Sequence, residues 1–351
     1  MPITTTCIGA YPKPDYVKLP DWFTAPAHPD AGSAIKQWAD ALADLGPDTE
    51  ALLDRAVQEV ITDQVQAGID IPTDGEIPRE NYVHYHCRHL DGIDFSLLDH
   101  RIMRNGSYEA DLPTITGPIR AQKPFLVKDW QRAQNHTSNP VKITIPGPMT
   151  ITDTTADVFY NEPKKLGVAL AQALNHEVLA LAAAGCRYIQ IDEPLFARKP
   201  AAALSYGIEN LERAFHGCPP EVIRVSHMCC GYPDRLDQPN YVKADPLAYL
   251  QLADAIEDST IMAVSLEDAH RHNDLALLEH FHRTSVIFGV VAIADSRVES
   301  VDEIRQRLLQ VLEHIDNERL LAAPDCGLGF LDRKLALKKL HNLGVAARSV
   351  Q

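Results

Sequence analysis

The stretch that decides the fold spans residues 141–194 and reads VKITIPGPMTITDTTADVFYNEPKKLGVALAQALNHEVLALAAAGCRYIQIDEP. Two short β-branched runs, Val141–Ile145 and Tyr188–Ile191, lie near its ends. Between them, Asn161–Ala184 carries apolar side chains three and four residues apart, and this pattern stops at Gly185. Such spacing is typical of an amphipathic helix, and a glycine commonly follows the end of one. The stretch therefore predicts a strand, a helix and a second strand parallel to the first.

The same alternation extends along the whole chain. Eight runs are expected to form strands: Thr4–Ile8, Asp70–Thr73, Val141–Ile145, Tyr188–Ile191, Val222–Ser226, Ile261–Ser265, Val286–Val291 and Leu320–Ala323. Further helical patterns occur at Pro246–Glu257, Asn273–Arg283, Ser300–Ile315 and Asp332–Arg348. This alternation of strands and helices predicts an α/β fold of the TIM-barrel, or (β/α)8, type. No glycine-rich dinucleotide-binding motif follows the first strand, which argues against an open nucleotide-binding sheet.

Two segments interrupt this alternation of strands and helices, and we expect them to be insertions after strands 1 and 2. Residues 11–47 are rich in proline and aspartate. Residues 77–140 include RNGSYEADLPTITG, which predicts a hairpin that turns near Asn105-Gly106. The second insertion is expected to lie over the mouth of the barrel. No linker marks a boundary, so residues 1–351 are predicted to form one barrel domain.

The composition restricts the possible functions. The chain has 351 residues, of which 45% are hydrophobic, enough to bury a large core. Its 33 basic and 48 acidic residues give a net charge of −15, which disfavours binding to nucleic acid or to an anionic membrane. We expect a cytoplasmic protein without a membrane-spanning segment. Seven cysteines, an odd number, favour free thiols or metal ligands over a disulfide framework.

A candidate metal site combines residues from three strand ends. His227-x-Cys229 follows one predicted strand, Glu267 follows the next, and Cys326 follows the last. In a TIM barrel these ends meet at one mouth, and a set of imidazole, thiolate and carboxylate ligands suits zinc. Cys230 competes with Cys229, but alternate strand residues point oppositely, so Cys229 shares the direction of His227. The alternative is that these residues are ordinary core side chains.

Two further strand ends supply carboxylates. Thr73–Glu76 reads TDGE, and Asp192–Pro194 reads DEP. Such groups commonly cap the helix that follows, but they also bind a substrate ammonium or position a proton. We favour substrate binding for Asp192 and Glu76, because both lie at the predicted mouth.

Seven motifs, in sequence order, resemble the catalytic barrel of the cobalamin-independent methionine synthases. They are TTTCIGAYPKP, IPTDGEIPREN, ITIPGPMTI, IQIDEP, HMCCGY, VSLED and APDCGL, and they extend almost from end to end of the chain. The resemblance implies a short, single-barrel form in which His227, Cys229, Glu267 and Cys326 hold zinc. It also implies that Asp192 and Glu76 bind the amino group of homocysteine, the thiol that receives the methyl group. The segment Gly9-Ala10 would lie beside the carboxylate of homocysteine.

The chain departs from the family pattern at two positions. Ala10 stands where the longer enzymes have a serine, which removes one hydroxyl contact to the substrate carboxylate. Ala294 stands where the family has the histidine thought to protonate the departing folate. Asp295 is a candidate replacement acid. The methyl donor therefore stays open among a folate, a corrinoid or corrinoid protein, and another compound.

Alternative functions remain at this stage. An epoxyalkane:coenzyme M transferase resembles this barrel and would need a basic residue, such as Lys13, Arg79 or Arg297, for the sulfonate. A noncatalytic zinc protein would close the metal site with four protein ligands. A decarboxylase of the related porphyrinogen-processing barrels would not need the metal ligands.

Overall fold

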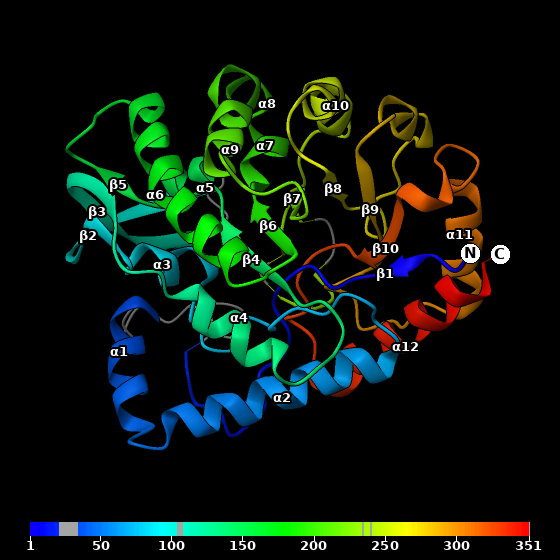
Figure 1. Cartoon of the computed structure of the whole chain (residues 1–351), viewed down its shortest axis with the longest axis horizontal. Helices are drawn as coiled ribbons and strands as arrows, with labels where there is room; N and C mark the ends of the chain where they lie inside the picture. Colours follow the sequence, from blue (N-terminus) through cyan, green and yellow to red (C-terminus); the bar gives the residue numbers. More distant parts are fainter. Residues whose placement is uncertain (21–33, 104–107, 234, 239–240, 351) are drawn as a thin grey trace.

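A computed structural model of the chain describes all residues except 21–33, 104–107, 234, 239–240 and 351. Its main sheet is parallel and runs in the order β1-β10-β9-β8-β7-β6-β4 (Figure 1). The strands are β1 (Thr4–Thr5), β4 (Lys142–Pro146), β6 (Tyr188–Asp192), β7 (Ile223–Met228), β8 (Ala263–Leu266), β9 (Ser285–Val291) and β10 (Leu320–Pro324). Seven of the eight predicted strand positions therefore lie in this sheet.

The eighth predicted strand, Asp70–Thr73, joins the two edges of the sheet. Single parallel bridges connect Thr6 to Ile71 and Thr73 to Lys142. Pro72 has no N–H to donate, but its carbonyl accepts a hydrogen bond from the Lys142 N–H at 2.9 Å. The segment thus closes the barrel with isolated bridges rather than a regular ladder, and the TIM-barrel prediction is confirmed.

The helices alternate with these strands and surround them. Those of the chain's first half are α1 (Ala34–Asp44), α2 (Thr49–Ala67), α3 (Tyr82–Cys87), α4 (Leu126–Gln134), α5 (Pro148–Asp153) and α6 (Pro163–Ala183). The second half contributes α7 (Pro194–Arg198), α8 (Pro200–Ala202), the π-helix η2 (Ala203–Gly207), α9 (Ile208–Ala214), α10 (Ala248–Asp258), α11 (Val301–Val311) and α12 (Arg333–Ser349). Two 3-10 helices, η3 (Leu275–His280) and η4 (Asn317–Arg319), complete the set in the described residues.

One predicted helix was wrong in type, since Asn273–Arg283 forms only the 3-10 turn η3.

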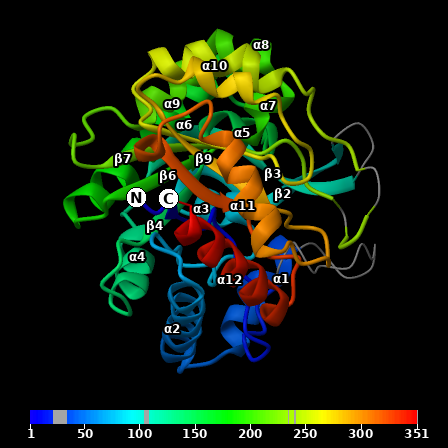
Figure 2. The same cartoon turned by 90° about the vertical axis from the view of Figure 1, so that its right-hand side faces the viewer.

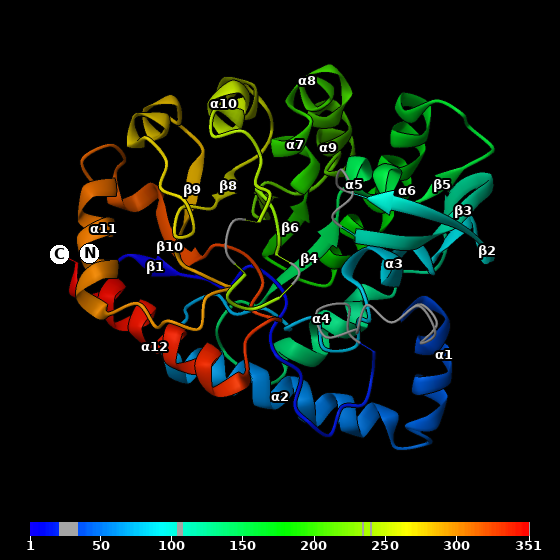
Figure 3. The same cartoon turned by 180° about the vertical axis from the view of Figure 1, so that it is seen from behind.

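The chain ends lie side by side, and the Ile3 N–H donates to the Ala347 carbonyl. Figure 2 looks toward these ends, where α11 and α12 cover the sheet. Helix α12 also packs along α2, as seen from behind in Figure 3.

The segment 77–140 contains α3, α4 and an antiparallel hairpin of β2 (Leu90–Met103) and β3 (Tyr108–Ala121). The short β5 (Ala156–Asp157) pairs with β3. The predicted turn at Asn105-Gly106 lies outside the described residues. That 77–140 and 11–47 are insertions into a single domain stays a prediction.

The core has two layers. A small inner group of Ile8, Val225, Ala263, Ile287 and Ala323 fills the barrel below its mouth. A larger group packs between the strands and the surrounding helices. Because all main strands are parallel, their carboxyl ends meet at one mouth, and polar side chains there face each other above the apolar filling.

By length and composition, α6 is the one helix in the described part of the chain that could cross a membrane. This differs from the expectation that the chain has no such segment. Half of the relevant window is buried inside the protein, however, and α6 packs against α5, α9 and β3. An apolar helix buried against its neighbours is what a barrel shell requires.

Candidate active site

A pocket of about 520 Å³, open to solvent, lies at the barrel mouth. Its lining consists of Ile8, Gly9, Ala10, Glu76, Tyr82, Asp192, Pro194, Arg198, His227, Cys229, Tyr232, Cys326 and Gly327. Every residue predicted from the sequence to bind substrate is among them. So are three of the four predicted metal ligands, whereas Glu267 and Asp295 are not part of the lining.

His227, Cys229 and Cys326 form a compact cluster. One ligand atom from each lies within 4.8 Å of the others. His227 and Cys229 face the same way because they are two residues apart at the end of β7. A hydrogen bond of 3.0 Å between His227 Nδ1 and Ser265 Oγ leaves Nε2 facing the Cys326 sulfur at 3.3 Å. One nitrogen and two sulfurs are thus directed at a common point.

The two thiols of the cluster interact directly. A hydrogen bond from Cys326, together with His227, lowers the pKa of Cys229 well below its usual value. The same bond, with burial, raises the pKa of Cys326. The Cys229 sulfur therefore gives up its proton more readily than an ordinary thiol, and a divalent ion that binds both sulfurs would take the place of the shared proton. Soft sulfur and imidazole donors of this kind fit zinc.

Glu267 lies beside this cluster but outside its 4.8 Å limit. Its Oε1 accepts the N–H of Cys230 at 2.9 Å, and its Oε2 lies 3.3 Å from the ammonium of Lys243. Burial, followed by the charge of Cys229, raises its pKa. The thiol of Cys230 is absent from the cluster and from the pocket lining, and burial raises its pKa to about 12.

Asp325 connects the two loops that carry Glu267 and Cys326. It precedes Cys326 and is fully buried. Its carboxylate accepts the N–H groups of Asp268, Ala269 and His270 at 2.8–2.9 Å. The sequence analysis did not identify this role, although the neighbouring Asp325-Cys326 pair offered a signal.

Glu76 and Asp192 lie close to each other in the same pocket, where Asp192 on β6 is the register partner of His227 on β7. Glu76 has φ of 56°, a left-handed conformation that is unusual for a side chain other than glycine and is typical of functional sites. Burial, together with the charge of Asp192, raises the pKa of Glu76 to about 7. Burial also raises the pKa of Asp192, which accepts a hydrogen bond from Gln190 Nε2 at 2.7 Å. Two buried carboxylates that repel each other favour a cation between them.

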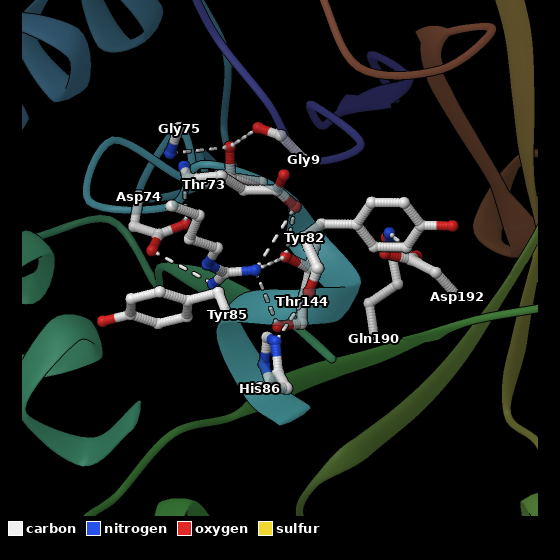
Figure 4. Close-up of polar contacts among 12 residues, drawn as sticks. Gly9, Thr73, Asp74, Gly75, Tyr82, Tyr85, His86, Thr144, Gln190 and Asp192 are labelled. Atoms are coloured by element: carbon white, nitrogen blue, oxygen red, sulfur yellow. Dashed lines mark hydrogen bonds and ion pairs between the residues drawn. The ribbon is translucent and has the colours of Figure 1, made fainter. Parts of the chain in front are cut away.

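A network of buried groups holds Glu76 in place. Thr144 donates to Glu76 Oε1 at 2.6 Å, and Arg79 lies 3.4 Å from the same oxygen (Figure 4). Arg79 also contacts Asp74 at 3.3 Å and the Thr144 hydroxyl at 2.8 Å. Figure 4 further shows the Thr73 hydroxyl bonded to the Gly9 carbonyl. The carboxylate is therefore fixed before any substrate binds.

Other sequence candidates lie elsewhere. Asp295 accepts the Arg297 N–H at 2.8 Å, and its side chain is 41% exposed outside the pocket lining. Arg297 also pairs with Glu303 at 2.9 Å. Lys13 donates to the Arg79 carbonyl at 2.9 Å.

Three lining residues were missed by the sequence analysis: Tyr82, Arg198 and Tyr232. Arg198 lies four residues after Pro194, close enough to the DEP motif to be considered. No local pattern, however, indicates on which side of such a short helix a side chain points. Tyr82 comes from α3, in a segment whose position over the barrel cannot be read from the sequence.

Comparisons with known proteins agree with this geometry. The profile of the family described as cobalamin-independent synthase, catalytic domain, matches residues 3–349. A methionine synthase of Thermococcus kodakarensis is 30% identical over 97% of this chain and 91% of its own length. One of Sulfolobus acidocaldarius is 29% identical over 97% and 90%.

Among solved structures, a B12-independent methionine synthase from Shewanella sp. W3-18-1, in complex with selenomethionine, matches with a TM-score of 0.84. It is 30% identical and covers 99% of this chain and 97% of its own. A putative B12-independent methionine synthase from Listeria monocytogenes shares the fold, with a TM-score of 0.70 at 18% identity. The resemblance inferred from the seven motifs is thereby confirmed. The chain belongs to the family of the cobalamin-independent synthase catalytic domain and is an enzyme of the methyltransferase class.

Proposed function

We propose that this enzyme is a zinc-dependent methyltransferase that transfers a methyl group to the sulfur of homocysteine and so forms methionine. The observation that carries the proposal is the pocket itself. It combines a nitrogen and two sulfurs within 4.8 Å of each other with two buried carboxylates, and one of these, Asp192, is the register partner of His227 on the neighbouring strand. Homocysteine carries a thiol at one end and an ammonium at the other, so its charges complement this pocket.

His227, Cys229 and Cys326 would hold the zinc ion, with Glu267 as the candidate fourth ligand. Zinc, when bound, favours the thiolate form of a thiol that joins its ligands, and the thiolate is the nucleophile in methyl transfer. The Ser265 contact keeps the imidazole oriented toward the sulfurs. Asp325 holds the loops of Glu267 and Cys326 in a fixed position relative to each other.

Glu76 and Asp192 would bind the substrate ammonium. A cation between them relieves their mutual repulsion and favours the ionised form of both. Gly9 and Ala10 line the pocket next to Glu76, and among the described residues their N–H groups donate to no acceptor. Backbone N–H groups in such a position are suitable donors to a substrate carboxylate.

The methyl donor stays open. A corrinoid or corrinoid protein was one expectation, but the cobalamin-independent family speaks against it. Asp295 as the acid that assists the leaving group stays a prediction, and so does the cytoplasmic location.

The alternatives are less well supported. Coenzyme M has no ammonium to occupy the buried carboxylate pair Glu76 and Asp192, and the basic residues first considered for its sulfonate, Lys13, Arg79 and Arg297, all have partners in the protein. Against a noncatalytic zinc protein, His227, Cys229 and Cys326 line an open pocket, as expected of a catalytic site with room for a substrate.

The experiment that tests the proposal combines metal analysis with an activity screen. Purified enzyme should contain about one zinc per chain. With homocysteine and methyltetrahydrofolate, methylcobalamin or an epoxide offered in turn, mass spectrometry should detect methionine with one of the methyl donors. Cys326→Ser should lose zinc and activity together, and full zinc retention in this variant would contradict the ligand assignment. A thioether formed only from the epoxide would favour the alkyltransferase alternative.

A further inference from the structure

Arg198 is a cationic residue of the pocket that has no role in the proposed function. It ends α7, is half-buried, and is the one arginine or lysine that lines the pocket in the described chain. Its guanidinium makes no hydrogen bond or ion pair with any other described residue. A guanidinium that faces a pocket without a partner is a typical binding group for a carboxylate or another oxyanion.

The backbone that carries Arg198 is firmly held. Glu193 precedes α7, and its buried carboxylate accepts the N–H groups of Met149 and Thr150 at 2.9 and 3.0 Å. Phe196, in the middle of α7, is fully buried. Lys199, the next residue after Arg198, pairs with Asp153 outside the pocket. The two adjacent cations thus differ, since Lys199 has a protein partner and Arg198 has none in the part of the chain that the structure describes.

Arg198 is not among the cations that act most on the carboxylate pair. Its charge acts on Cys229, whereas the cations that act most on Glu76 and Asp192 are Arg79, Lys142 and His227. Both terminal nitrogens of Arg79 already contact Asp74, Glu76 or Thr144, and its side chain is buried. The pocket therefore has an acidic subsite for a cation and a separate, available guanidinium for an anion.

We propose that Arg198 binds the carboxylate of the amino-acid thiol and thereby selects an α-amino acid over a simple aminothiol. This inference rests on the proposed function, because it assumes that the thiol and the ammonium occupy the subsites assigned above. Ala10 offers no side-chain donor to the carboxylate, so on that side only backbone N–H groups are available. The guanidinium at the end of α7 would supply a second, charged partner for a carboxylate with two oxygens.

Calorimetry with two thiols tests the role of Arg198. Zinc-loaded enzyme is titrated with L-homocysteine and with 3-aminopropane-1-thiol, which keeps the amine and the thiol but lacks the carboxylate. Arg198→Gln should weaken homocysteine binding by about 10- to 100-fold, the usual range for a charged hydrogen bond. Binding of 3-aminopropane-1-thiol should change by less than about twofold. The homocysteine affinity of Arg198→Lys should lie between those of the wild type and Arg198→Gln, since lysine keeps the charge but not the paired donors.

Lys199→Gln is the matched control, because it removes the adjacent cation outside the pocket and should leave both affinities unchanged. Equal losses for both thiols in Arg198→Gln, or no loss for homocysteine, would overturn the inference. The second of these results would assign the guanidinium to an anionic group of the methyl donor instead. Failure of the wild type to bind homocysteine at all would overturn the proposed function, and the inference with it.

Discussion

Replacing Gly9 with alanine would place a methyl group against the carboxylate of Glu76. A Cβ built at position 9 lies 2.8 Å from Glu76 Oε1 and 3.5 Å from Thr144 Cγ2. Ordinary contacts begin near 3.4 Å, so the carboxylate would have to retreat by about 0.6 Å. The backbone of Gly9 lies outside the left-handed region, and alanine therefore adds no backbone strain of its own.

The carboxylate has no free direction in which to retreat. The same Oε1 accepts the Thr144 hydroxyl at 2.6 Å and lies 3.4 Å from Arg79. Overpacking of this kind costs about 1–3 kcal/mol of stability. A displaced Glu76 would also lose its alignment with the substrate ammonium, a charged hydrogen bond worth about 1.5–3 kcal/mol. Because 1.4 kcal/mol corresponds to about a tenfold change, we expect homocysteine to bind about 10- to 100-fold more weakly.

The assay is calorimetry of zinc-loaded Gly9→Ala with homocysteine, accompanied by urea denaturation and zinc analysis. Gly117→Ala is a matched control, because its Cβ meets only the Gly92 Cα, at an ordinary 3.7 Å. The control should keep both affinity and zinc. If folded Gly9→Ala binds homocysteine within about twofold of the wild type, then Glu76 does not hold the ammonium and the reasoning fails.

Two further predictions concern the same carboxylates. Homocysteine affinity should rise as the pH increases through about 7, because burial raises the pKa of Glu76 to about 7 and only the ionised form attracts an ammonium. The Glu76→Gln variant should lose that rise, and an identical pH profile would refute the assignment. In urea denaturation, the Glu76 contribution to wild-type stability should fall between pH 4.5 and about 7, since the folded protein retains a proton that the unfolded chain releases. Asp192→Asn should weaken homocysteine binding about tenfold and spare the zinc; unchanged affinity by calorimetry would reject its substrate-binding role.

The fold could be predicted from the sequence because a TIM barrel repeats one local pattern. Each β-branched run and each helical spacing is a local signal, and eight of them in one chain restrict the topology. The prediction failed where tertiary contacts override such signals. Asn273–Arg283 has helical spacing but forms only a 3-10 turn, where Asn273 instead bonds to Asp268 and Glu267.

The candidate metal ligands could be predicted for a related reason. Residues at strand ends of a closed parallel barrel must converge, so a distant pair such as His227 and Cys326 can be assigned to one site without coordinates. Convergence does not fix every contact of a side chain, however. Glu267 follows its strand as expected and its carboxylate interacts with Cys229, but it also contacts the Cys230 N–H and Lys243. The loop residue Lys243 carries no sequence pattern that reveals this contact.

The balance of charge in the pocket also depends on pairings that a sequence does not encode locally. Arg79 and Arg198 are chemically identical, and either could be assigned to an anionic substrate from sequence alone. Arg79 is committed to Asp74 and Glu76, where it fixes an acidic subsite, while Arg198 has no such partner among the described residues. Arg79 thus fixes the acidic subsite that would bind a cation, whereas Arg198 stays available to bind an anion. An acidic protein with a net charge of −15 would in this way retain a substrate carboxylate, because the attraction would come from one direct contact rather than from the overall field, which salt screens.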